Sequence, residues 1–229
     1  TAYGLLSYVT AYLKYYYPVE FMTALLTSEI GDYEQTTKYI NECHRMGIKV
    51  LPPNINKSER YYTPSDGNIL FGFESIKGVG ENAALQIIDE RKNGLFKDLS
   101  DFINRCKVDS STIISLIKSG SFGDDKDQLL YEYAKTNAPK YTFKEVTSLP
   151  TKAKLYELNI ITTDEQFNNK EFCLVKYNDY RKKEYNNKYK VKLDKYYNTF
   201  KEKYMSTPVM YEYETLSIFI NGSPFDDVK

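Results

Sequence analysis

The residues best suited to bind a ligand form the short run Ile76-Lys77-Gly78-Val79-Gly80-Glu81. Two glycines one residue apart allow a tight turn with positive φ and leave the main chain uncovered by side chains. A helix-periodic stretch follows, so we expect the amides of Val79, Gly80 and Glu81 to face outward at a helix N-terminus. Such an end binds anions, because its first N–H groups have no partner inside the helix. Lys77 adds a positive charge, and the run therefore predicts a phosphate-binding turn.

A turn of this kind between two helices is typical of a helix-hairpin-helix element. Ala83 and Ala84 are small enough to let the helices pack closely, and a second unit without glycines follows at residues 107–110. A tandem of such units predicts contact with the phosphates of double-stranded DNA. Phosphate contacts carry no base information, so this binding would not depend on DNA sequence. The alternative is a tight loop that only precedes a core helix.

No pattern in the sequence indicates catalysis. His44 is the only histidine, and no motif beside it supplies a nucleophile that it could activate as a base. The carboxylate pairs Asp124-Asp125 and Asp226-Asp227 lie in loops and are more typical of solvated residues than of metal ligands. We therefore expect no catalytic residue, no metal site and no cofactor within this chain.

Charge and cysteine spacing limit the class of protein further. The chain has 31 Lys and Arg against 31 Asp and Glu, so nucleic-acid binding must come from local groups rather than from a global field. Cys43, Cys106 and Cys173 lie far apart, which favours reduced thiols over a disulfide framework or a zinc site. No apolar run approaches the length of a membrane span. These features predict a cytoplasmic protein without membrane contact.

The elements that must position the turn are mainly helical. Apolar periodicity predicts helices over residues 5–16, 19–30, 33–46, 83–91, 99–106, 113–117 and 127–135. A β-hairpin is expected within residues 61–73, around a turn at residues 64–67. Residues 140–205 are polar, rich in tyrosine and poorly periodic, which predicts an ill-defined α/β connector that can be partly disordered. The fold class expected is therefore mainly α, with a small β-hairpin.

One part of this connector has a distinct composition. Residues 170–205 hold 11 Lys and Arg against 5 Asp and Glu, with seven tyrosines between them. Cations and aromatic rings could hold phosphates and stack on bases. A solvated, charged linker has the same composition.

Long stretches of the first 122 residues resemble the C-family replicative polymerases of bacteria, the α subunits of DNA polymerase III. The matching runs are residues 2–8, 12–14, 17–27, 42–56, 71–73, 76–80 and 116–122. Residues 213–226 resemble the start of the OB-fold domain in that family, although Ser223 stands where the family usually has histidine.

The resemblance implies a domain assignment. Residues 1–60 would be the C-terminal part of the fingers, 61–123 the tandem helix-hairpin-helix module that holds duplex DNA, 124–212 a connector, and 213–229 the start of the OB-fold region. Tyr3 would pack near the nascent base pair, with an ordinary core tyrosine as the alternative.

The resemblance also implies partners. They would be double-stranded DNA, the rest of the α chain and the sliding clamp. The nearest approximation to a clamp-binding peptide is Gln128-Leu129-Leu130-Tyr131, with an ordinary helix face as the alternative. The metal-binding aspartates of the palm precede the matching region in the family, so Mg²⁺ would be needed only in the complete polymerase, and this chain is expected to be inactive alone.

Three interpretations remain open from the sequence. The chain begins inside a predicted helix without methionine, which favours a fragment or split-gene product of the polymerase. A stand-alone DNA-binding accessory without catalysis would reuse the same module. An inactive relic would have lost DNA affinity.

Overall fold

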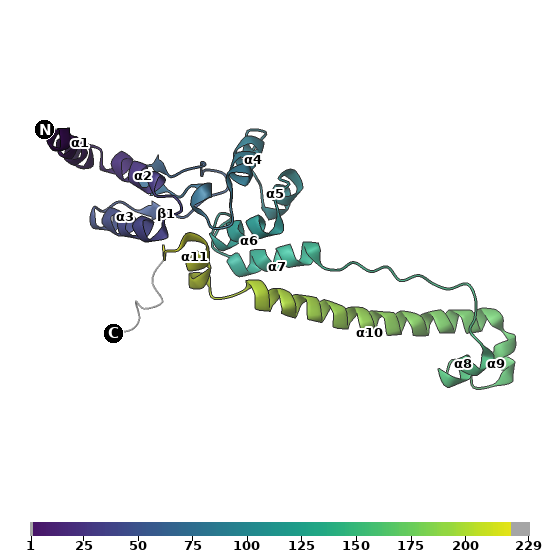
Figure 1. Cartoon of the computed structure of the whole chain (residues 1–229). Helices are drawn as coiled ribbons and strands as arrows, with labels where there is room; N and C mark the ends of the chain where they lie inside the picture. The colour runs from purple at the N-terminus through teal and green to yellow at the C-terminus, as the bar shows by residue number, and fades with distance from the viewer. Residues whose placement is uncertain (1, 221–229) are drawn as a thin grey trace, which may run out of the picture. The chain divides into compact units, whose positions relative to one another are not determined.

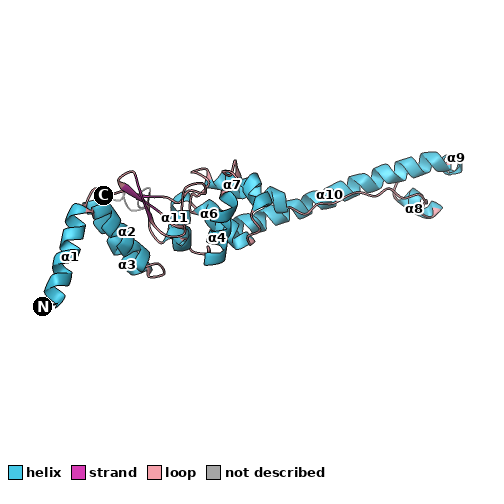
Figure 2. Ribbon diagram, turned by 90° about the horizontal axis from the view of Figure 1, so that it is seen from above, coloured by secondary structure: helices cyan, strands magenta, loops and turns pink. Residues whose placement is uncertain are grey.

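The computed structural model describes residues 2–220, and they are mainly helical (Figures 1 and 2), which confirms the predicted fold class. The α-helices of this described part are α1 (Ala2–Tyr16), α2 (Pro18–Ser28), α3 (Tyr33–Arg45), α4 (Glu81–Arg91), α5 (Leu99–Arg105), α6 (Ser110–Lys118), α7 (Lys126–Asn137), α8 (Lys152–Glu157), α9 (Asp164–Asn168), α10 (Lys170–Tyr204) and α11 (Pro208–Leu216). The remaining elements are the strands β1 (Val50–Leu51), β2 (Thr63–Ser65) and β3 (Asn68–Leu70) and the 3-10 turn η1 (Phe73–Ser75).

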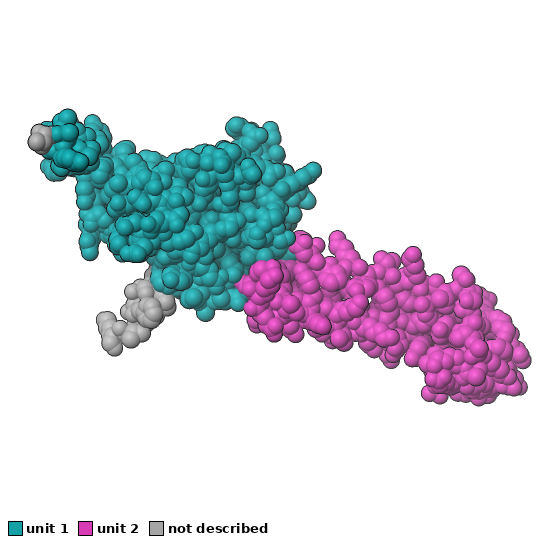
Figure 3. All heavy atoms as spheres, in the orientation of Figure 1, with its two compact units in different colours: residues 1–133, 205–229 teal, residues 134–204 magenta. Residues whose placement is uncertain are grey.

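The chain divides into two compact units (Figure 3). Unit 1 contains the residues up to Tyr133 and those from Met205 onward, and unit 2 is Ala134–Tyr204. Unit 1 is therefore built from two segments that are far apart in the sequence. The domain assignment made from the family resemblance stays a prediction.

The first helices of unit 1 begin and end within a few residues of the predicted bounds. Pro18 occupies the first turn of α2, where its missing N–H costs nothing. Asp32 caps α3, and its Oδ1 accepts hydrogen bonds from the amides of Glu34 at 3.1 Å and Gln35 at 3.0 Å. Gly47 follows α3 with φ +75°, a conformation that ends a helix and favours glycine.

Between α3 and the glycine turn that precedes α4, the chain forms a small sheet with strand order β1-β3-β2. β2 and β3 pair antiparallel as the predicted hairpin, and β1 pairs parallel to β3. Asp66 and Gly67 have positive φ, so they form the two central residues of the turn. Pro64 lies in β2, so the tight turn starts one residue later than predicted.

Helix α11 closes unit 1 by packing on α6. Lys126 Nζ lies 3.0 Å from Glu212 Oε1, and both side chains are almost fully buried. The hydroxyl of Tyr211 donates to Asp127 Oδ1 at 2.7 Å. A more exposed ion pair joins Lys118 and Glu214 at 2.6 Å. These interactions fix the second segment of unit 1 to the first across more than 80 residues.

In unit 2, an irregular segment before α8 is held against α10. Asn178 pairs with Val146 through both its side-chain oxygen and its side-chain nitrogen, each at 3.0 Å from the backbone. The hydroxyl of Tyr189 donates to the Pro139 carbonyl at 3.1 Å. Leu155, Ile161 and Cys173 form a small buried core between α8, the following turn and α10. Side chains of α10 thus hold the irregular segment through hydrogen bonds to its backbone, without strong apolar periodicity.

The thiols of the chain lie in the interior. Cys43, Cys106 and Cys173 are all free and buried. Burial raises the pKa of Cys43 and of Cys106 to about 11, which keeps both protonated near neutral pH. In the described part of the chain, no helix is long and apolar enough to cross a membrane.

The buried ion pair gives a stability prediction. Replacing Lys126→Met removes the cation that lies 3.0 Å from the buried Glu212 carboxylate, and should lower the free energy of unfolding by about 3–5 kcal/mol. The matched change Lys118→Met affects a pair whose carboxylate is 39% exposed, and should cost about 1 kcal/mol or less. Urea denaturation followed by circular dichroism measures both. Equal losses would contradict the assignment of α11 closure to the buried pair.

Candidate nucleic-acid interface

The glycine turn lies at the surface, immediately before α4. Gly78 has φ +86°, and Gly80 is the N-cap of α4 with an extended backbone at φ −86° and ψ 171°. Both glycines are exposed, whereas the side chain of Val79 between them is buried. The element before the turn is the 3-10 turn η1 rather than an α-helix. Val79 therefore anchors the turn in the core while the neighbouring backbone faces solvent.

The amides of the turn divide into two groups. The Val79 amide donates to the Ile76 carbonyl at 3.0 Å, so it closes the hairpin and does not face outward as expected from the sequence. The Lys77 amide donates to the Thr215 carbonyl of α11 at 2.8 Å. Within the described part of the chain, no hydrogen bond uses the amides of Gly80 or Glu81. Those two N–H groups are therefore available to an anion.

Helix α6 supports the turn from inside. A Cβ atom on Gly78 would lie 2.6 Å from Ser115 Oγ, closer than non-bonded atoms approach. Thr112 Oγ1 lies 3.0 Å from the Gly78 carbonyl oxygen, and its single proton is shared between this carbonyl and the carboxylate of Asp109. Gly78 is thus required both for its positive φ and for this close approach. Nothing lies within 4 Å of a Cβ built on Gly80.

The second hairpin, which precedes α6, offers a different surface. Asp109 is its N-cap, and its carboxylate accepts hydrogen bonds from the hydroxyls of Ser111 and Thr112. These hydrogen bonds hold the pKa of Asp109 below its usual range. A carboxylate at this helix start repels an anion, so the second hairpin does not duplicate the first.

Charged side chains surround the first turn. Lys77 Nζ lies 4.3 Å from the ring centroid of Tyr33, which holds the cation beside the turn. Glu81 would repel a phosphate, but Arg60 lies 2.7 Å from its carboxylate and also contacts Glu74 at 2.5 Å. Sequence reasoning missed Arg60, because nothing in its neighbourhood marks a partner 21 positions away.

Tyr3, the residue predicted near a nascent base pair, lies on α1 and is 84% exposed. It is not a core residue in this chain, and its proximity to a nucleotide stays a prediction. None of the described residues of α1 is buried.

The run Gln128-Leu129-Leu130-Tyr131 lies inside α7. Leu130 is fully buried, Leu129 is half-buried, and Gln128 donates to Glu132 at 3.0 Å. Only part of the run is therefore accessible in this helix, and its role in clamp binding stays a prediction.

Metal-binding patterns do not occur in the described residues 2–220, where no three His, Cys, Asp or Glu side chains come together in a way that could hold an ion. Asp124 and Asp125 are exposed. Asp226-Asp227 and Ser223 lie outside the described residues.

The region around the turn matches a known class of structural element. Residues 47–128, which include the turn and α4–α6, match the family model described as a helix-hairpin-helix motif. This class of element is the one that the sequence and the geometry of the turn indicate.

About half of the chain is also similar to the α subunit of DNA polymerase III. It is 47% identical over 125 residues to that of Deinococcus radiodurans, 44% identical over 130 residues to that of Campylobacter jejuni, and 45% identical over 130 residues to that of Thermus aquaticus. These matches cover 53%, 54% and 54% of the chain but only 9%, 11% and 11% of the relatives. The predicted resemblance is confirmed, and the chain spans about a tenth of each relative's length.

The two glycines should respond differently to substitution. Gly78→Ala forces a side chain into positive φ and against Ser115, and should lower the free energy of unfolding by about 1–3 kcal/mol. Gly80→Ala has an ordinary φ and open space, so it should change stability by less than about 0.5 kcal/mol. Thermal denaturation of both variants measures this. Equal destabilisation would contradict the packing of the Gly78 turn on α6.

Proposed function

We propose that the turn before α4 binds the phosphate backbone of double-stranded DNA, as part of the α subunit of a replicative DNA polymerase III. The observation that carries this proposal is the pair of free amides of Gly80 and Glu81 at an exposed helix start, with Lys77 beside them. The similarity to the polymerase subunit and to the helix-hairpin-helix motif supports DNA as the source of the phosphate.

The mode of binding follows from the groups present. The two amides donate hydrogen bonds to one phosphate, which the positive end of the α4 dipole also attracts. Lys77 adds a charge-assisted contact. Arg60 reduces the repulsion from Glu81 by holding its carboxylate. None of these groups reads a base edge, so the grip is independent of sequence and can follow the duplex as synthesis proceeds.

A proline at position 81 tests the amide contact with little disturbance of the helix. Proline is favoured at the first position of a helix, and the extended backbone of Gly80 suits the residue before proline. Glu81→Pro removes one phosphate-facing N–H and the carboxylate, whereas the control Glu81→Ala removes the carboxylate alone. We expect Glu81→Pro to bind duplex about tenfold more weakly than Glu81→Ala, since a hydrogen bond to a charged group is lost.

Fluorescence anisotropy with a labelled duplex, measured across salt concentrations, gives both affinities. Lys77→Gln should make the salt slope of duplex binding shallower by about 0.9, the effect of one phosphate contact. Equal affinities of the proline and alanine variants would exclude the amide contact. A folded chain without duplex affinity would favour an inactive relic.

The catalytic part of the proposed polymerase would belong to another part of the subunit. In the complete subunit, template-directed nucleotidyl transfer would use Mg²⁺ held by other carboxylates, and this chain would contribute duplex binding and processivity. Contact of the segment at Gln128 with a sliding clamp belongs to the same proposal.

Helix α1 is the surface through which the rest of the subunit would join. Its apolar side chains Leu5, Leu6 and Leu13 are 67%, 61% and 38% exposed, an arrangement expected for a helix that packs on other polypeptide. A separately expressed catalytic part from the same source should co-elute with this chain in size-exclusion chromatography. Leu6→Glu should abolish co-elution, while Val191→Glu, an equally exposed position on α10, should not. Absence of co-elution would favour a stand-alone accessory.

A further inference from the structure

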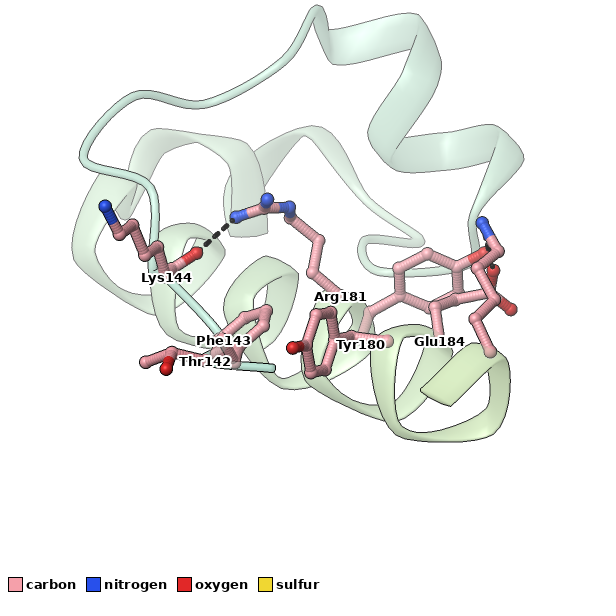
Figure 4. A pocket seen from close by; sticks show the side chains of 8 residues that line it. Thr142, Phe143, Lys144, Tyr180, Arg181 and Glu184 are labelled. Carbon is pink, nitrogen blue, oxygen red and sulfur yellow. Dashed lines mark hydrogen bonds and ion pairs between the residues drawn. The ribbon is translucent and has the colours of Figure 1, made fainter. Parts of the chain in front are cut away.

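Unit 2 contains a groove that the proposed duplex grip does not use (Figure 4). Its volume is about 500 Å³, and it lies between the irregular segment before α8 and the middle of α10. Apart from Thr142 and Glu184, the side chains that line it are basic or aromatic, namely Phe143, Lys144, Tyr180, Arg181, Tyr185 and Lys188. Glu184 is the one acidic residue among those that line it.

The charge of the chain is unevenly divided between its parts. Residues 134–204 contain 16 Lys and Arg against 9 Asp and Glu, whereas the other residues contain 15 against 22. The neutral chain thus carries a local charge of +7 in unit 2, balanced by −7 elsewhere. Among the described residues, the basic side chains of α10 form a single ion pair, Lys188 with Glu184 at 3.8 Å. Cations left without carboxylate partners attract a polyanion.

The walls of the groove are held in place by aromatic contacts. Tyr185 packs against Phe143 with ring centroids 5.5 Å apart, and Tyr189 packs against Tyr141 at 5.4 Å. The rings of Tyr185 and Tyr189 thus hold the irregular segment on α10. A site whose walls are already fixed loses little conformational entropy on binding.

Tyr180 and Arg181 are placed differently from these packed tyrosines. In the described part of the chain, the partly exposed ring of Tyr180 packs on no other aromatic ring, so one face can accept a planar group. Arg181 donates to the Lys144 carbonyl at 3.3 Å and lies 5.5 Å from the ring centroid of Phe143. Its guanidinium is thus fixed at the groove, and no carboxylate of the described residues neutralises it.

We propose that this groove binds single-stranded nucleic acid, with a base stacked on Tyr180 and phosphates near Arg181, Lys144 and Lys188. Aromatic rings beside cations are the combination that holds unpaired strands without sequence preference. Among the described residues, Arg181 and Lys144 form no ion pair, whereas Lys188 lies 3.8 Å from Glu184. The volume suits an unstacked nucleotide and is too small for a duplex. The chain would then contact DNA of two kinds, duplex at the α4 turn and single strand at unit 2.

Fluorescence anisotropy of the full chain with labelled oligothymidylate tests the proposal. Tyr180→Ala should weaken single-strand binding about tenfold, and Tyr180→Phe should retain it, because stacking needs the ring and not the hydroxyl. The pair Lys144→Gln/Lys188→Gln should make the salt slope shallower by about 1.4, the effect of two contacts to a single strand. The control pair Lys195→Gln/Lys201→Gln has the same change in charge at exposed sites on α10 that do not line the groove, and should alter the slope much less.

The outcomes are distinguishable from those of the duplex site. Glu81→Pro should leave oligothymidylate binding unchanged, and Tyr180→Ala should leave duplex binding unchanged. Circular dichroism at 222 nm verifies that α10 persists in every variant. Three results would overturn the proposal: full affinity in Tyr180→Ala, equal losses in the two lysine pairs, or Tyr180-dependent binding to phosphatidylserine vesicles with no binding to oligothymidylate.

Discussion

The arrangement of the candidate interface depends on the close contact between the Gly78 turn and α6. Glycine is favoured at this position because φ +86° strains a residue with a side chain and because a Cβ atom here would lie 2.6 Å from Ser115 Oγ. The contact is reinforced by Thr112, whose hydroxyl lies 3.0 Å from the Gly78 carbonyl oxygen, and by the carbonyl of Thr215, which accepts the Lys77 amide. Together these interactions fix the backbone so that the next two amides meet solvent at the start of α4.

The glycine turn also depends on helix α11. Thr215 lies on α11, which the buried pair of Lys126 and Glu212 joins to the start of α7 and the pair of Lys118 and Glu214 joins to α6. A segment more than 130 residues after the turn therefore supplies one of the acceptors that shape it. Chain closure and the geometry of the candidate interface are thus parts of one packing arrangement.

Electrostatics in this chain act locally. Outside unit 2 the acidic residues exceed the basic ones, so the turn must attract phosphate through aligned amides and one nearby lysine rather than through a broad positive surface. In unit 2 the charge is positive and largely unpaired, and aromatic side chains accompany it. The α4 turn offers amides that can bind a duplex phosphate, whereas the groove in unit 2 also offers an aromatic ring on which an exposed base can stack.

The elements that carry strong local signals were predictable from the sequence. Helical periodicity, the Asp32 cap and the glycines that end helices gave the first seven helices and the hairpin within a few residues. Two interactions were missed: the Val79 amide is used by the Ile76 carbonyl within the turn, and Arg60 reaches Glu81. The second joins residues 21 positions apart, so only tertiary packing decides it. The structure of residues 138–189 depends on pairings such as Asn178 with Val146, for which a sequence has no periodic signature.

The central claim is that DNA phosphate contacts the amides of Gly80 and Glu81. Titration of the ¹⁵N-labelled chain with a short duplex, followed by two-dimensional amide NMR, observes those two groups directly. The account predicts that the Gly80 and Glu81 resonances shift most within the module, while the internally bonded Val79 amide shifts little. Duplex binding that moves resonances elsewhere and leaves Gly80 and Glu81 unchanged would contradict it.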